Sequence, residues 1–196
     1  NLLTRFEIGT ILEAFLSVAV TPFIFTVEPS NRHVVYHLPM QNDTERRLAK
    51  IFSQDRGIEI LPVTEMPSGA EITNISALGV REAIESVADL VQTQEHLMAY
   101  AGTAIEGESL YWIDIHHSAA SKGEAVSKLK QDLGVSQVIC FGDSDNDLSM
   151  FAMADESYAP SNAKDEVRAV ATAVIGHHNE DGVSRFLRER FDLAMH

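Results

Sequence analysis

Four polar residues that could bind a metal ion follow one another closely in the chain: Asp143, Asp145, Asn146 and Asp147. Carboxylates this close together repel one another strongly unless a cation or protons intervene. Ligation by oxygen alone suits a hard ion, with Mg²⁺ as the first choice. A solvated acidic turn is the simpler alternative. The apolar run 138–141 before the cluster and the helix start after it favour the metal site, because open α/β sheets bind ligands where their strands end.

A lysine earlier in the chain could act together with this cluster. Ser121 and Glu124 have the spacing of a capping box, which places Lys122 in the first turn of a helix. A cation is unfavourable there, because the helix dipole attracts anions to that end. A surface lysine is the simpler alternative, but Lys122 and the helix N-terminus could instead share an anion. An ammonium group next to Mg²⁺ is what a phosphoryl group requires, since positioned positive charge stabilises its transfer.

The elements that position these residues can be predicted from hydrophobic periodicity and turn residues. Helices are expected near residues 3–16, 42–52, 80–91, 121–133, 147–154, 165–171 and 182–191. Strands are expected near residues 21–27, 34–37, 58–63, 71–75, 97–104, 110–115, 138–141, 158 and 173–175, with a hairpin turn at 106–108. The fold class is therefore α/β, with a partial Rossmann-like parallel sheet in residues 109–196 and a separate mixed α/β layer in residues 1–108.

Composition excludes several classes of protein. The chain has 196 residues and a net charge of −14, which argues against a nucleic-acid surface. The apolar stretch 8–27 is interrupted by Glu13 and Pro22, so no membrane segment is expected. The single cysteine, Cys140, rules out an internal disulfide and indicates a reducing compartment, so a cytoplasmic location is expected. Zinc at the pairs His116–His117 or His177–His178 is disfavoured, because adjacent strand residues point to opposite faces.

Four motifs together resemble the haloacid dehalogenase superfamily, specifically its Cof-type phosphatases with a C2 cap. They are Ser121-Lys122-Gly123, the run GDSDNDLSM at 142–150, Ser161-Asn162-Ala163 and the run NEDGV at 179–183. Their order and spacing agree with the family patterns over residues 110–190. The earlier residues resemble a cap only in the order of their elements.

The resemblance implies roles for individual residues. Asp143 would ligate Mg²⁺ directly or through water, and Asp147 would support the ion from a second position. Lys122 would contact the transferring phosphoryl group, and Asn146 would hydrogen-bond that group or the substrate. Asp145 falls at the variable position of the motif and receives no role.

Asn162 is expected only at the border of the site.

The chain departs from the family in one respect. Family members begin with a strand ending in D-x-D-G-T, whose first Asp is the nucleophile and whose second is the general acid/base. Asp143-Ser-Asp145 and Asp114-Ile-His116 match this pattern only superficially. Because the chain begins at Asn1, we expect a fragment that lacks the nucleophile segment and is inactive alone. The edge of strand 138–141 would then be exposed, which favours oligomerisation, binding of the missing segment, or partial disorder after about residue 118.

The expected activity of the parent protein is Mg²⁺-dependent hydrolysis of a small phosphate ester such as a sugar phosphate. Residues 1–108 would form the cap that closes over the site and selects the leaving group. Two alternatives remain open. One is a phosphosugar mutase of the same superfamily, and the other is a catalytically inactive module that binds a metal or a partner.

Overall fold

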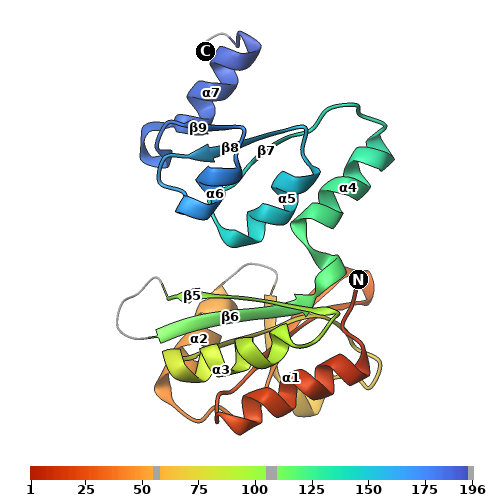
Figure 1. The fold of residues 1–196 in the computed structure, drawn as a ribbon. Coiled ribbons are helices and arrows are strands. Elements are labelled where there is room, and N and C mark those ends of the chain that lie inside the picture. Colours follow the sequence, from red (N-terminus) through yellow and green to blue (C-terminus); the bar gives the residue numbers. More distant parts are fainter. Residues whose placement is uncertain (55–57, 105–109, 194–196) are drawn as a thin grey trace. The chain divides into compact units, whose positions relative to one another are not determined.

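The computed structural model describes residues 1–54, 58–104 and 110–193, and the chain divides into two compact units, Asn1–Ala119 and Ala120–His196 (Figure 1). The division lies later than the boundary predicted at residue 108. The strand β6, Leu110–His117, explains the difference, because it pairs with strands of the first unit on both of its sides. The predicted hairpin turn at 106–108 lies outside the described residues.

The first unit contains a six-stranded sheet with the order β3-β2-β1-β4-β6-β5. Its other strands are β1 (Phe23–Glu28), β2 (Arg32–His37), β3 (Ile58–Pro62), β4 (Glu71–Val80) and β5 (Leu97–Thr103). Only the pair β2–β3 is parallel, and the other neighbours run antiparallel. All six strands were predicted. β4 extends further than expected because its last residues continue to pair with the first residues of β6.

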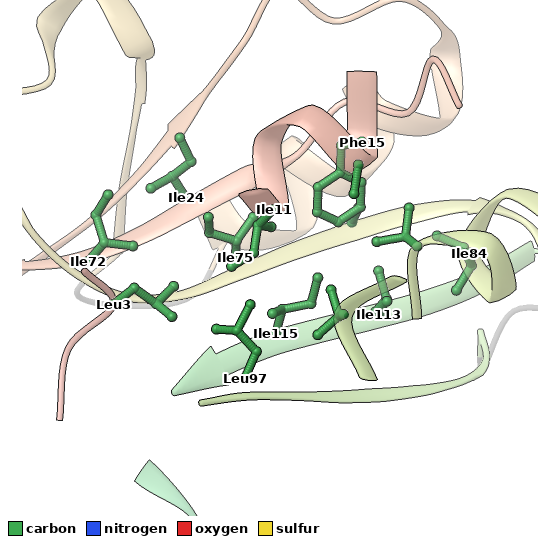
Figure 2. Close-up of a cluster of buried hydrophobic side chains, with 14 of the residues drawn as sticks. Leu3, Ile11, Phe15, Ile24, Ile72, Ile75, Ile84, Leu97, Ile113 and Ile115 are labelled. Carbon is green, nitrogen blue, oxygen red and sulfur yellow. The ribbon is translucent and has the colours of Figure 1, made fainter. Parts of the chain in front are cut away.

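Helices pack on both faces of this sheet. They are α1 (Arg5–Ser17), α2 (Asp43–Gln54) and α3 (Arg81–Gln92). Successive side chains of a strand point to opposite faces of the sheet, so the buried side chains form two clusters. Ile24 belongs to one cluster and its neighbour Phe23 to the other. The larger cluster includes Ile11 and Phe15 of α1 with Ile84 of α3, all fully buried against β4 and β6 (Figure 2). The smaller cluster joins α2 to β1, β2 and β3.

The second unit has a three-stranded parallel sheet with the order β7-β8-β9. Its elements are α4 (Lys122–Leu133), β7 (Ile139–Phe141), α5 (Leu148–Met153), β8 (Glu156–Pro160), α6 (Asp165–Val170), β9 (Ala173–Ile175) and α7 (Gly182–Phe191). Cys140, Phe151, Ala159, Ala163 and Val167 form its buried core. The predicted parallel sheet is therefore present, and the two units together have the predicted fold class.

β7 differs from the prediction in its burial. Of its residues only Cys140 is buried, and Ile139 and Phe141 are half-buried. The reason is its position at the sheet edge, where it pairs with β8 alone among the described strands. The expected free edge is therefore present. None of the helices in the described part of the chain is long and apolar enough to span a bilayer.

Candidate functional site

The acidic cluster forms a tight turn between β7 and α5. A short 3₁₀ helix, η4 (Asp145–Asp147), continues directly into α5. The carboxylate of Asp147 organises this turn, because its Oδ2 accepts hydrogen bonds from the backbone N–H of Asp143 at 2.9 Å and of Ser144 at 3.1 Å. The side chain of Asp147 is only 5% exposed. The turn is therefore built around this buried carboxylate.

Lys122 reaches the turn from the start of α4. Ser121 caps that helix by accepting a hydrogen bond from the backbone N–H of Glu124 at 3.2 Å, which is one of the two bonds of the predicted capping box. Lys122 Nζ lies 2.5 Å from Oδ1 of Asp147 and 3.3 Å from Oδ1 of Asn146. The structure thus brings together three of the predicted site residues. Asp147 supplies the anion that offsets the unfavourable position of the lysine at a helix N-terminus.

Opposing effects act on the pKa of Asp147. Burial alone would raise it, but the hydrogen bond from Lys122 and those from the backbone of Ser144 and Asp143 hold the pKa of Asp147 below its usual value. Asp147 is therefore ionised at neutral pH and stays paired with the ammonium group of Lys122.

Asp143 is held by its backbone and presents its side chain to solvent. Its N–H donates to Asp147, and its carbonyl oxygen accepts a hydrogen bond from the backbone N–H of Lys164 at 3.0 Å. The residue is exposed, and its carboxylate has no hydrogen-bond or ion-pair partner within the described ranges. Of the three aspartates in the turn, Asp143 is thus the one whose carboxylate is open to a ligand.

Sequence reasoning missed Lys164. Its Nζ lies 2.5 Å from Oδ2 of Asp145, so this lysine holds the turn through both its backbone and its side chain. The other oxygen, Oδ1 of Asp145, is buried and accepts no hydrogen bond from any residue that the structure describes. The only signal in the sequence is that Lys164 directly follows the 161–163 motif, and a lone lysine there resembles an ordinary surface residue.

Asn162 forms a link within the second unit. Its Oδ1 accepts a hydrogen bond from the backbone N–H of His178 at 3.1 Å. The rings of His177 and His178 stack with their centroids 4.6 Å apart.

Among the residues that the structure describes, no three His, Cys, Asp or Glu side chains come together as metal ligands. In the acidic turn, Asp143 supplies the one open carboxylate among the described residues.

Gly123 allows α4 to approach α5 closely. Its N–H donates to Oγ of Ser149 at 3.2 Å, and a Cβ at this position would lie 2.4 Å from the backbone oxygen of Ser149. The glycine of the 121–123 motif is therefore needed for the packing that brings Lys122 to the turn.

We expect Gly123→Ala to destabilise the protein by about 1–3 kcal/mol, because the helices must separate to relieve the backbone overlap. The matched control is Gly9→Ala in α1, where a Cβ would meet nothing within 4 Å. It should stabilise by about 0.5–1 kcal/mol, since alanine is the better helix former. Urea unfolding measures both, and equal effects of the two variants would contradict the packing argument.

Comparison with known proteins identifies the family. A profile of the haloacid dehalogenase-like hydrolases matches residues 10–187. The chain belongs to this family. A putative phosphatase from Haemophilus influenzae is 38% identical over 82 residues, which cover 41% of this chain and 31% of that protein. Pyridoxal phosphate phosphatase YbhA from Escherichia coli is 26% identical over 193 residues, covering 91% of this chain and 70% of that protein.

Solved structures of other haloacid dehalogenase-like hydrolases have the same fold. One from B. subtilis superimposes with a TM-score of 0.75 at 20% identity, covering 96% of this chain and 71% of its own. Another, from Bacteroides thetaiotaomicron, has a TM-score of 0.69 at 18% identity, covering 96% of this chain and 68% of its own. The matches to the first curated relatives span only 31%, 31% and 30% of those proteins.

Proposed function

We propose that this chain is part of a Mg²⁺-dependent phosphomonoester hydrolase that acts on a small phosphorylated metabolite, such as a sugar phosphate. The observation that carries the proposal is the convergence of Lys122, Asn146 and Asp147 at the end of a parallel strand. Family membership supports it, as do the names of similar phosphatases. The substrates in those names are pyridoxal phosphate, 5-amino-6-(5-phospho-D-ribitylamino)uracil and phosphoglycolate, and all three are small phosphate esters.

Lys122 is the residue that we assign to the phosphoryl group. Its side chain is 49% exposed even though its ammonium group contacts the buried Asp147. Asp147 and Asn146 accept two of the three N–H donors of the ammonium group and fix its direction, which leaves the third donor to bind a phosphoryl oxygen. Asn146, at 3.3 Å from the same nitrogen, would donate from its amide to the phosphate or the leaving group.

Asp143 is the residue that we assign to the metal ion, because its carboxylate is exposed and open. Asp147 was expected to support the ion from a second position. Both of its oxygens already accept hydrogen bonds, so we propose that it supports the site by holding Asp143 and Lys122 in place. Bound Mg²⁺ would neutralise charge on the phosphate, and the described residues by themselves supply only part of its coordination.

The nucleophile would come from outside residues 1–196, since their sequence contains no D-x-D-G-T motif. We propose that a strand carrying this motif pairs with the free edge of β7, which would also be the route by which copies of the chain associate. The first unit would then serve as the cap. We also propose a cytoplasmic location, because a single cysteine cannot form a disulfide within the chain.

The proposal is tested by adding a peptide or domain with the D-x-D-G-T strand to the chain and measuring hydrolysis of p-nitrophenyl phosphate with and without Mg²⁺. We expect activity only with both components and the metal. A matched peptide with Asn in place of the first Asp should give none, because the covalent phosphoaspartyl step needs that carboxylate. Hydrolysis at enzyme-like rates by the chain alone would contradict the assignment of the nucleophile.

A further inference from the structure

The first unit contains a groove that the proposed phosphate chemistry does not use. It lies on the face of the sheet opposite α1 and α3, where α2 packs on β1, β2 and β3. On β4 and β6, the residues that alternate with the buried Ala77, Ile113 and Ile115 point to this same face. Among them are Ser76 and Asp114, which lie directly opposite each other in the register of the two strands.

The groove has the size and lining of a small-molecule site. Its volume is about 480 Å³, within the range of about 300–1,000 Å³ that is typical of ligand pockets. Apolar side chains from α2 and the sheet form its walls, and a few polar groups lie in its floor. The lining residues used below are Phe25, Leu48, Asn74, Ser76, Trp112 and Asp114.

The polar groups of the floor form an ordered chain. Asn74 Nδ2 donates to Oγ of Ser76 at 3.1 Å, and this hydroxyl donates to Oδ1 of Asp114. Ser76, in the middle of this chain, is only 9% exposed, and Asn74 and Asp114 are half-buried. The second oxygen of Asp114 has no partner among the described residues. The floor therefore holds one carboxylate oxygen in place as an acceptor for a ligand.

The charge of the groove restricts the ligand. Asp114 is the only charged residue in its lining, which contains no Lys, Arg or His among the described residues. An anionic group would be repelled here, whereas hydroxyl or amino donors would be attracted.

An aromatic ring supplies the apolar contact. Trp112 packs against Gly102 on the neighbouring strand β5, where an added Cβ would approach the ring to 3.1 Å. The glycine thus lets the indole ring lie close to the sheet. A ring held in this way offers a broad apolar surface beside the acceptor oxygen of Asp114.

We propose that this groove binds a small ring compound that carries hydroxyl or amino donors, with the donors bound by Asp114 and the ring packed on Trp112. The proposal goes beyond the phosphatase assignment, since the binding requires neither a phosphate nor a metal ion. Failure of one proposal therefore leaves the other untouched.

Trp112 allows a direct test, because it is the only tryptophan of the chain and lies in the groove. The chain is titrated without metal with three compounds of matched ring size: inositol, cyclohexylammonium and cyclohexanecarboxylate. Inositol tests hydroxyl donors and cyclohexylammonium tests amino donors. We expect a saturable change in tryptophan fluorescence with at least one of these two, with a dissociation constant of about 1–10 mM, and none with the carboxylate.

Variants assign the response to the groove. Asp114→Asn should weaken binding about tenfold, because it replaces a charged acceptor by a neutral one. Ser76→Ala should weaken it about threefold through loss of the hydroxyl that orients Asp114. The matched control Asp132→Asn, on an exposed position of α4, should leave the dissociation constant unchanged. Circular dichroism checks that each variant is folded.

Three outcomes would overturn the proposal. The first is the absence of a saturable response to inositol and cyclohexylammonium up to about 100 mM, roughly ten times the weakest expected dissociation constant. The second is a response to cyclohexanecarboxylate as strong as to either donor compound. The third is unchanged binding in both Asp114→Asn and Ser76→Ala while these proteins remain folded.

Discussion

Replacing Lys122 with methionine should lower kcat/KM for p-nitrophenyl phosphate by about 100- to 1,000-fold once the D-x-D-G-T strand is supplied. The ammonium group is the only cation in contact with both Asn146 and Asp147 among the described residues. Methionine keeps the length of the side chain but removes the charge that would stabilise the transferring phosphoryl group. Steady-state kinetics in Mg²⁺ measures the loss.

The control for this experiment is Lys128→Met on the same helix, where the lysine is 74% exposed and pairs with Asp132. It should retain nearly full activity, because exposed pairs of this kind contribute little. Binding of inorganic phosphate to the chain alone, followed by ³¹P NMR, gives a second readout that does not depend on the nucleophile. Equal activities of the Lys122 and Lys128 variants would refute the role assigned to Lys122.

Asp147→Ala should destabilise the second unit by about 2–4 kcal/mol. The substitution leaves the backbone N–H groups of Asp143 and Ser144 without their acceptor, and it removes the partner of Lys122. Asp132→Asn is the control, since the side chain of Asp132 is 53% exposed and should contribute less than about 0.5 kcal/mol. Urea unfolding, with the single cysteine kept reduced, measures both variants.

The pH dependence of stability provides a second check on Asp147. Its pKa is lowered in the folded state, so its contribution is fully present above the unfolded-state pKa of about 3.9 and is lost as the pH falls through the folded-state value. The difference in unfolding free energy between the wild type and Asp147→Asn should therefore shrink below about pH 4. A difference that stays constant from neutral to acid pH would show that Asp147 does not act through its charge.

Local patterns in the sequence predicted most of the elements. The two predicted elements 173–175 and 182–191 coincide with β9 and α7, because turn residues mark their ends and apolar spacing marks their faces. Gly134 ends α4 in the left-handed conformation, with φ at 62°, as a glycine in that position should. Such signals involve residues close together in the chain, and they can be recognised without knowing the tertiary structure.

Features that depend on distant residues were harder to predict. The pairing of β6 with β4 sets the boundary between the units, and the sequence of residues 109–117 does not indicate which strand β6 pairs with. The contact between Lys164 and Asp145 likewise exists only because α6 begins beside the acidic turn. The convergence of Lys122 with the acidic turn was expected because a phosphoryl group requires an ammonium group beside a metal ion, and the family resemblance then related the two motifs.

Contacts within the chain itself hold the second unit together at Asp147, Gly123 and Ser149. The side chain of Asp143 has no such partner among the described residues. A descendant that had lost its enzymatic role would still be under selection to keep the first three in order to fold. It could replace Asp143 at little cost. If Asp143 holds the metal ion as proposed, the residue at this one position is a better marker of retained catalysis in a survey of homologues than the motif as a whole.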